Sequence, residues 1–184
     1  VDMACGYFLG NPIKYKSESM DEGKAELDIT VLKDNFKDVD IHSHDVELDR
    51  DRSIYGIALE LAFTTEDEVP IVDFAEISPA HGFLVLDDTV KHRPLFAVHY
   101  YPQYDVNGSL SKYAIFVYTK EKIYTYSSKT LDEPRAYTLL GEADHYFGIV
   151  PFIEYKNKKS MQGDFEQVIS LIDAYNLLQS DRIN

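Results

Sequence analysis

The sequence predicts an α+β fold in which a mostly antiparallel sheet is flanked by helices and a long helix ends the chain. The 184 residues include 14 Tyr and 10 Phe but no Trp, and aromatic residues favour half-buried strands. Short alternating apolar segments separated by turn residues fill the middle of the chain, whereas apolar residues recur at helical spacing near its end. A chain of this length is expected to form a single domain, residues 1–184.

The first expected element is a short helix over residues 1–9. Gly10 and Pro12 follow it in the order typical of a helix stop, with a glycine just past the last turn and a proline after it. Gly6 lies one helical turn before Gly10, and this spacing suits close packing against a neighbouring element. Residues 13–16 are expected to be extended.

The pattern of residues 25–31 fits two structures. Its apolar residues alternate with Glu26, Asp28 and Thr30, as in a half-buried strand. The same residues also fit the opening of a helix. We expect a helix in this region only after Val31.

A second helix is expected from His44 to the residue before Gly56. Asp45 is its expected N-cap, since a carboxylate at that position accepts a hydrogen bond from an early amide. Leu48 and Arg52 fall on one face of this helix, followed by Tyr55. Gly56 then marks the switch from helix to strand.

Seven strands are expected after Gly56, at residues 57–64, 70–74, 82–86, 95–101, 113–119, 122–127 and 149–155. Asn107-Gly108 lies between two of them and favours the positive φ angles of a type I′ hairpin turn. Residues 119–122 form a short polar connection, so the strands on either side are expected to pair directly. The middle of the chain is therefore expected to be an antiparallel meander, without the βαβ alternation of nucleotide-binding sheets.

The last expected element is a helix that runs to the end of the chain. Asp164 and Gln167 have the spacing of a capping box, in which each side chain binds a backbone amide of the first turn. Phe165, Ile169 and Ile172 follow at three- and four-residue steps and are expected to dock this helix.

The charge of the chain limits its partners. It carries 14 excess negative charges, and residues 17–51 alone hold twelve carboxylates against four basic residues. A protein that grips nucleic acid needs clustered Lys and Arg, so the charge argues against stable DNA wrapping and against docking on anionic lipid. DNA passing along an acidic wall is compatible with this charge. No apolar run approaches the length of about 18 residues that spans a membrane.

A metal-dependent hydrolase is one alternative function. His42, His44 and Asp45 place three potential metal ligands within four residues. A metal site needs further ligands, and none of the other histidines stands at a recognisable ligand spacing. A solvated helix start is the simpler interpretation of these residues.

A stand-alone β-rich binding module is the other alternative. It would use the aromatic rim formed by residues 100–104, which include Tyr100, Tyr101 and Tyr104. Because basic residues do not flank this rim, the simpler interpretation is a strand end with one ring buried. Cys5 lies in an apolar segment without an adjacent histidine and is expected to behave as a small hydrophobic residue. We therefore expect no catalytic, metal-binding or cofactor-binding residues.

Several ordered segments resemble one known family. They are residues 1–13 (VDMACGYFLGNPI), 53–56 (SIYG), 150–157 (VPFIEYKN), 163–166 (GDFE), 171–176 (LIDAYN) and 180–181 (SD). Taken in this order, they resemble the portal proteins of long-tailed, siphovirus-type double-stranded DNA bacteriophages. The resemblance spans nearly the whole chain, but the chain covers less than half of a typical member.

The resemblance implies a structural role and no enzymatic activity. Portal proteins form rings, usually of twelve subunits, that replace one capsid vertex and conduct double-stranded DNA during packaging and ejection. The partners implied are other copies of the subunit, the terminase, the capsid and the head-completion or head–tail connector proteins. DNA is implied only in transit, and no membrane is involved. The implied location is the portal vertex of the virion, and the host cytoplasm during assembly.

The resemblance also implies which region of a portal this chain represents. Family members have wing, stem, clip and crown regions, and this chain would match the wing, with its last helix leading toward the stem. Because it begins in an apolar helical segment and ends without a helix stop, it is expected to be a piece of a longer protein. The residues expected to shape it are architectural, namely Gly6, Gly10, Pro12, Tyr55, Gly56, Pro151, Asp164, Phe165, Ile169 and Ile172.

Overall fold

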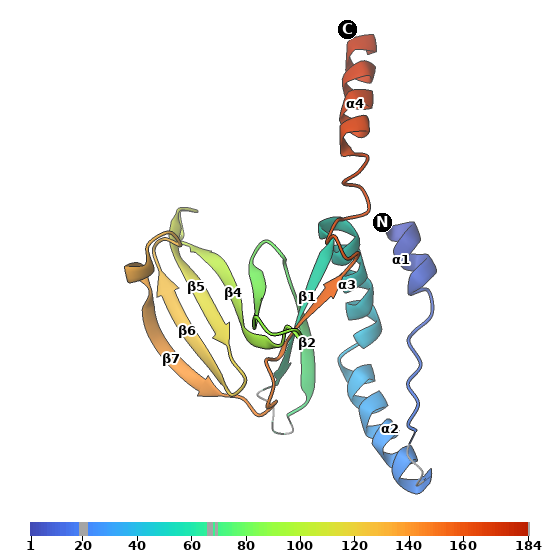
Figure 1. The fold of residues 1–184 in the computed structure, drawn as a ribbon, viewed down its shortest axis with the longest axis vertical. Coiled ribbons are helices and arrows are strands. Elements are labelled where there is room, and N and C mark those ends of the chain that lie inside the picture. Colours follow the sequence, from blue (N-terminus) through green and yellow to red (C-terminus); the bar gives the residue numbers. More distant parts are fainter. Residues whose placement is uncertain (19–21, 66–67, 69, 184) are drawn as a thin grey trace.

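The computed structural model describes residues 1–18, 22–65, 68 and 70–183. The helices are α1 (Asp2–Phe8), α2 (Glu22–Asp38), α3 (Ile41–Tyr55) and α4 (Ile169–Ile183), with a short 3-10 helix at Pro134–Ala136. The strands are β1 (Ile57–Thr64), β2 (Val72–Ile77), β3 (Gly82–Leu86), β4 (Pro94–Tyr104), β5 (Leu110–Tyr118), β6 (Lys122–Ser128), β7 (Thr138–Asp144) and β8 (Phe152–Lys156). All these strands pair antiparallel, which confirms the α+β class (Figure 1).

The strands divide between two sheets. One has the order β2-β1-β8, and the other is the expected meander, β3-β4-β5-β6-β7. In the smaller sheet the central strand β1 pairs on both sides, so that Leu61 stands opposite Ala75 of β2 and Phe152 of β8. Helix α3 packs against β1 and β2, and α1 packs against α3 (Figure 1).

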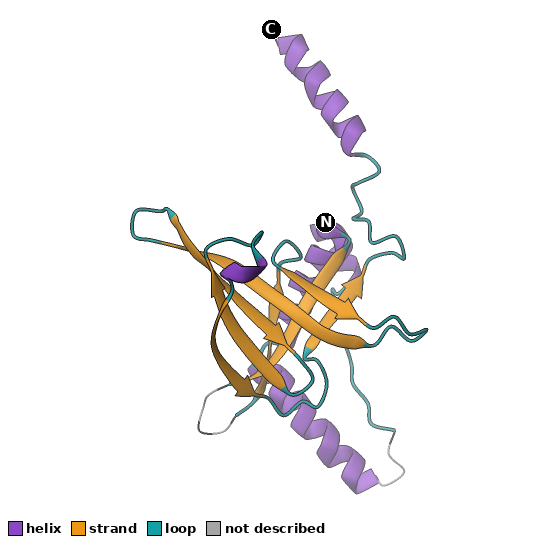
Figure 2. Ribbon diagram, turned by 60° about the vertical axis from the view of Figure 1, so that its left-hand side comes forward, coloured by secondary structure: helices purple, strands orange, loops and turns teal. Residues whose placement is uncertain are grey.

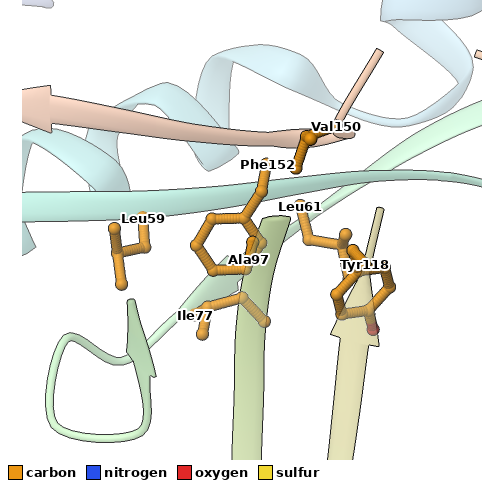
Figure 3. Packing of buried hydrophobic residues seen from close by; sticks show 7 residues of the cluster. All are labelled: Leu59, Leu61, Ile77, Ala97, Tyr118, Val150 and Phe152. Carbon is orange, nitrogen blue, oxygen red and sulfur yellow. The ribbon is translucent and has the colours of Figure 1, made fainter. Parts of the chain in front are cut away.

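The hydrophobic core lies between the two sheets. Figure 3 shows Leu59 and Leu61 of β1 facing Ala97 of β4 and Tyr118 of β5. The full cluster is Leu59, Leu61, Ile77, Ala97, Tyr118, Val150 and Phe152, each at most 8% exposed. Alternating side chains of a strand point to opposite faces, so the period-two pattern of β1 places its leucines together in this core.

The prediction of a helix only after Val31 is wrong, since α2 begins at Glu22. A run of seven alternating residues is too short to separate strand from helix, and the residues before Val31 are mostly good helix formers. Phe36 holds α2 against the body, with its ring 4.9 Å from that of Tyr15 and 6.2 Å from that of Phe74.

The prediction of Asp45 as the N-cap of α3 is also wrong. The helix begins at Ile41, and Asp40 precedes it in a left-handed conformation with φ 48°. Ser43 donates a hydrogen bond to the carboxylate of Asp40 at 2.8 Å. Asp45 therefore lies inside the helix, where the backbone amides already have helical partners.

The β4–β5 hairpin is confirmed, but its turn is not type I′. Gly108 has φ 78°, whereas Asn107 is not among the described residues with positive φ. Asp105 organises the turn, because its carboxylate accepts hydrogen bonds from the amides of Asn107 and Ser109, both at 2.9 Å.

The sequence pattern does not indicate strand β7. All seven of its residues are exposed, so it lacks the alternation that marks a half-buried strand.

Helix α4 differs from its prediction in two respects. It begins at Ile169, five residues after Asp164, so Asp164 and Gln167 do not form its capping box. The expected docking residues Phe165, Ile169 and Ile172 are 42–49% exposed. Figures 1 and 2 show α4 projecting away from both sheets. Within the described part of the chain, no helix is long and apolar enough to cross a bilayer.

Candidate functional site

The strongest cluster of expected residues lies where α3 ends and the chain leads into α4. Gly56 ends α3 in the left-handed conformation, with φ 80° and its amide donating to the Arg52 carbonyl at 3.0 Å. This confirms the predicted switch from helix to strand. A side chain on Gly56 would overlap the backbone of Met161 and Gln162. Glycine is therefore required here both for its positive φ and for the close approach.

Gly163 makes a second close approach from the other segment. It is buried, and a side chain there would overlap the carbonyl of Ile54. Met161, two residues earlier, has φ 54°, an uncommon conformation for a residue with a side chain. Two backbone segments far apart in sequence thus touch directly. We call this contact between residues 53–56 and 157–164 the junction.

Hydrogen bonds close the junction. The amide of Asp164 donates to the Ser53 carbonyl at 2.8 Å, and the amide of Asn157 donates to the Gly56 carbonyl at 2.9 Å. The hydroxyl of Ser53 donates to one carboxylate oxygen of Asp164. The side-chain amide of Asn157 donates to the other oxygen at 2.9 Å, and Lys158 lies 3.5 Å from it.

The carboxylate of Asp164 is the centre of this network. Its hydrogen bond from Ser53 and then that from Asn157 lower the pKa of Asp164 below its usual value. The sequence predicts Asp164 as a helix cap, but the structure uses it to tie the α4 segment to α3. The junction therefore sets where the chain leaves the body just before α4.

The structure brings some of the expected architectural residues together and separates others. Gly56 and Asp164 both belong to the junction, and Tyr55 lies within its 53–56 segment with its side chain 48% exposed. Gly10 follows α1, where a side chain would overlap the carbonyl of Gly6. Gly6 itself has open space beside it, so it makes no close packing contact of the kind expected.

The remaining residues serve other parts of the fold. The carbonyl of Pro151 accepts a hydrogen bond from the amide of Ala62 at 2.9 Å, which joins the start of β8 to β1. Pro12 lines a hollow beside Phe36 of α2. Ser53, Asn157 and Gly163 take part in the junction, although sequence reasoning assigned them no role. Their only signal was their presence in the segments that carry the family resemblance.

A buried polar cluster lies between α3 and the smaller sheet. His44 is held by two carboxylates, with its Nε2 atom 2.9 Å from Glu60 and its Nδ1 atom 2.8 Å from Glu76. The hydroxyl of Tyr155 donates to the second oxygen of Glu60 at 2.6 Å. Burial lowers the pKa of His44, but its hydrogen bond to Glu60 and the charges of both carboxylates outweigh burial and raise that pKa. Ionised carboxylates only accept hydrogen bonds, so a carboxylate at each ring nitrogen favours the imidazolium form of His44.

This geometry counts against the metal-dependent hydrolase. Residues two apart on a helix point to nearly opposite sides, so His42 and His44 of α3 do not converge on one ion. Both ring nitrogens of His44 are occupied by carboxylates. Within the described residues, no group of three or more His, Cys, Asp or Glu side chains is arranged to hold a metal.

The expected aromatic rim is divided between the faces of the larger sheet. Tyr101 lies on the face of β4 that carries the buried Ala97, and its ring, 37% exposed, stacks on that of Phe116 with centroids 6.0 Å apart. Tyr100 points to the opposite face and donates to the carbonyl of Ala80 at 2.8 Å. There it lines an apolar groove of about 520 Å³ together with Phe83 and Val98. Strand alternation separates these neighbours, so they do not form one stacking platform.

Comparison with known proteins identifies the family. A family model described as phage portal protein, SPP1 Gp6-like, matches residues 1–184. The chain belongs to this portal protein family. A portal protein of Bacillus phage SPP1 is 26% identical over 196 residues, and this alignment covers 100% of the chain and 37% of the relative. The chain thus spans little more than a third of the relative's length. The match confirms the resemblance, and the portal family is one of structural proteins of the phage virion.

The junction of this portal chain leads to a testable prediction. Replacing Ser53 by alanine should lower the free energy of unfolding by about 1–2 kcal/mol, because the carboxylate of Asp164 loses the hydrogen bond donated by this buried residue. Hydrogen exchange should also rise at residues 157–168 before it rises in β1. Exchange measured by mass spectrometry checks this. An equal rise in all elements would contradict a local role for Ser53.

Proposed function

We propose that this chain forms the wing region, residues 1–184, of a portal subunit that assembles into a dodecameric ring at one vertex of the phage capsid. Double-stranded DNA would pass through the ring during packaging and ejection. The terminase, the capsid and the head-completion proteins would dock on it. Assembly would take place in the host cytoplasm, and the finished ring would reside in the virion. The match of the portal family model to all 184 residues is the observation that carries this proposal.

The exposed surface of α4 supports an assembled state. The helix places Leu171, Tyr175, Leu177 and Leu178 in water, each between 61% and 69% exposed. A helix with apolar residues on several sides is normally buried in its working state. In a portal ring, neighbouring copies and the stem would cover these side chains. The junction would fix the direction in which α4 leaves the wing.

The charge balance supports a conduit in which DNA is not held. The 14 excess negative charges oppose a stable contact with phosphates, because binding to DNA gains its free energy largely from released counterions. A wall of this sign allows the duplex to move along it. The proposed role needs no catalytic step in this chain.

Electron microscopy of the full-length polypeptide tests the proposal. We expect closed rings that consist of twelve subunits around a central channel. Folded protein that remains monomeric over a wide range of concentration and ionic strength would contradict the portal role. Circular dichroism separates this result from misfolding.

A further inference from the structure

A surface pocket between the two sheets has a composition unusual for this acidic chain. It has a volume of about 700 Å³ and lies among the β3–β4 connection, the β5–β6 turn and β8. Its apolar lining includes Leu84, Leu86, Ile149 and Ile153, and Ile149 is 65% exposed. Apolar side chains gathered around a hollow favour a partner that brings apolar groups of its own.

Basic side chains surround this pocket. Arg93, Lys120 and Lys156 line it, although the chain as a whole carries 14 excess negative charges. Glu154 is the carboxylate in the lining, and it lies 3.2 Å from Lys156. Among the described residues, neither Arg93 nor Lys120 has an ion-pair partner within 4.0 Å. The pocket therefore combines an apolar floor with three cationic side chains against one carboxylate in its lining.

A carboxylate beside the pocket is tied into the turn that precedes Arg93. Asp87 is the nearby carboxylate, and one of its oxygens accepts the backbone amide of Arg93 at 2.9 Å and the hydroxyl of Thr89 at 2.7 Å. These bonds hold Asp87 in the turn, where its charge still interacts with that of Arg93. No ion pair within 4.0 Å joins the two side chains among the described residues, and the exposed guanidinium of Arg93 stays accessible to a second partner.

One face of α2 has the complementary composition. Val31, Asp34 and Asp38 are spaced three and four residues apart, so they form a stripe along one side of the helix. Val31 is 63% exposed, and both carboxylates are exposed with no ion pair among the described residues. Asp34 and Asp38 are one turn apart and repel each other, which a cationic partner would relieve.

The contacts of α2 leave this stripe accessible. Asn35 and Phe36 hold the helix against the body, since the side-chain amide of Asn35 donates to the carbonyl of Val72 at 2.8 Å. The basic residues Lys33 and Lys37 of α2 lie toward a different hollow, next to Pro12. Figure 1 shows α2 extending past the end of the sheet that α3 covers.

We propose that the pocket receives the Val31–Asp34–Asp38 stripe of α2 from a second copy of this chain. The inference rests on the proposed ring, in which each subunit must present two different, mutually complementary patches to its neighbours. Val31 would enter the apolar floor, and Asp34 and Asp38 would meet Arg93 and Lys120. Nucleic acid fits less well, because a phosphate backbone brings no apolar group to fill the floor.

Charge reversal on the full-length polypeptide tests this contact. One variant carries Arg93→Glu and Lys120→Glu, and the other carries Asp34→Lys and Asp38→Lys. Each should weaken subunit association at least about tenfold, since like charges then face each other. A single chain that carries all four substitutions should form rings again, to about the same fraction as the wild-type protein. Native mass spectrometry at matched concentrations measures it.

Matched controls place the same charges elsewhere. Lys112→Glu with Lys129→Glu reverses two exposed lysines outside the pocket, and Asp132→Lys with Glu133→Lys reverses two exposed carboxylates outside the stripe. Neither control should change the ring population. A loss of rings in the controls equal to that in the test variants would overturn the contact. The change in net charge alone would then explain the loss in the test variants.

A cross-link gives a second readout. Val31→Cys combined with Ile149→Cys should yield a ladder of disulfide-linked oligomers under oxidising conditions, whereas each single change should not. The native Cys5 is buried and does not compete. Absence of the ladder in a chain that still forms rings would overturn the contact.

The outcomes separate this inference from the proposed function. Rings that persist in both charge-reversal variants overturn the contact and leave the portal role intact. Wild-type protein that never forms rings overturns both. If the Arg93 and Lys120 variant keeps its rings but loses affinity for a labelled DNA duplex, the pocket is a nucleic-acid site and the contact is overturned.

Discussion

Replacing Gly56 by alanine is expected to lower the free energy of unfolding of the 184-residue chain by about 3 kcal/mol or more. The left-handed conformation at φ 80° costs a residue with a side chain about 1–2 kcal/mol. The added methyl group would also overlap the backbone of Met161 and Gln162. Backbone atoms cannot rotate out of the way, so the junction must open or shift. Urea unfolding followed by circular dichroism measures the loss.

Gly108→Ala is the matched control for this prediction. Gly108 has nearly the same φ, 78°, but no atom lies within 4 Å of the position that its side chain would take. Gly108→Ala should therefore lower the free energy of unfolding only by the cost of the left-handed conformation, about 1–2 kcal/mol. The difference between the two variants reports the close approach at the junction. Equal losses would show that the segments at Gly56 do not pack as tightly as described.

Replacing Glu60 by glutamine should lower the free energy of unfolding by about 3 kcal/mol, close to the effect of removing one partner from a buried ion pair. Glu60 is 5% exposed and binds both the His44 ring and the Tyr155 hydroxyl. The change removes the carboxylate charge that faces the imidazolium while leaving the volume nearly unchanged. Glu76 remains as the other carboxylate on His44, but its side chain is 37% exposed and its charge is better screened.

The stability of the Glu60→Gln variant should depend less on pH than that of the wild-type protein. Because the pKa of folded His44 lies above its ordinary value of 6.5, its contribution to stability is fully present below pH 6.5 and is lost as pH rises through the folded pKa. Without Glu60 the raised pKa falls back, so this loss becomes smaller. Unfolding curves of both proteins between about pH 5.5 and pH 9 check the sign.

Glu142→Gln is the control for the buried pair. Glu142 binds Lys122 at 2.6 Å, but both side chains are exposed, 51% and 37% respectively. Water screens exposed pairs, so Glu142→Gln should lower the free energy of unfolding far less than Glu60→Gln. A similar small loss in both variants would mean that the His44 cluster is far better solvated than its burial implies.

Much of the fold follows from local patterns. The alternation of β1 and the glycine at residue 56 each describe a few consecutive residues, and both predictions are confirmed. Local patterns do not identify the helix at residues 22–31 or strand β7, since neither segment shows a periodicity long enough to indicate its structure. The capping box at Asp164 failed because that side chain gains better partners from α3 and Asn157 than from the amides of its own segment.

The sequence by itself determined the α+β class, the order of most strands, the helix-to-strand switch at Gly56 and the membership of the portal family, because each depends on local spacing or on an ordered set of motifs. Only the tertiary structure decided what the polar residues do. Ser53 and Asp164 are 111 residues apart, and Tyr155 and Glu60 are 95 apart. Their meeting depends on β8 returning to pair with β1, a long-range contact that no local pattern encodes.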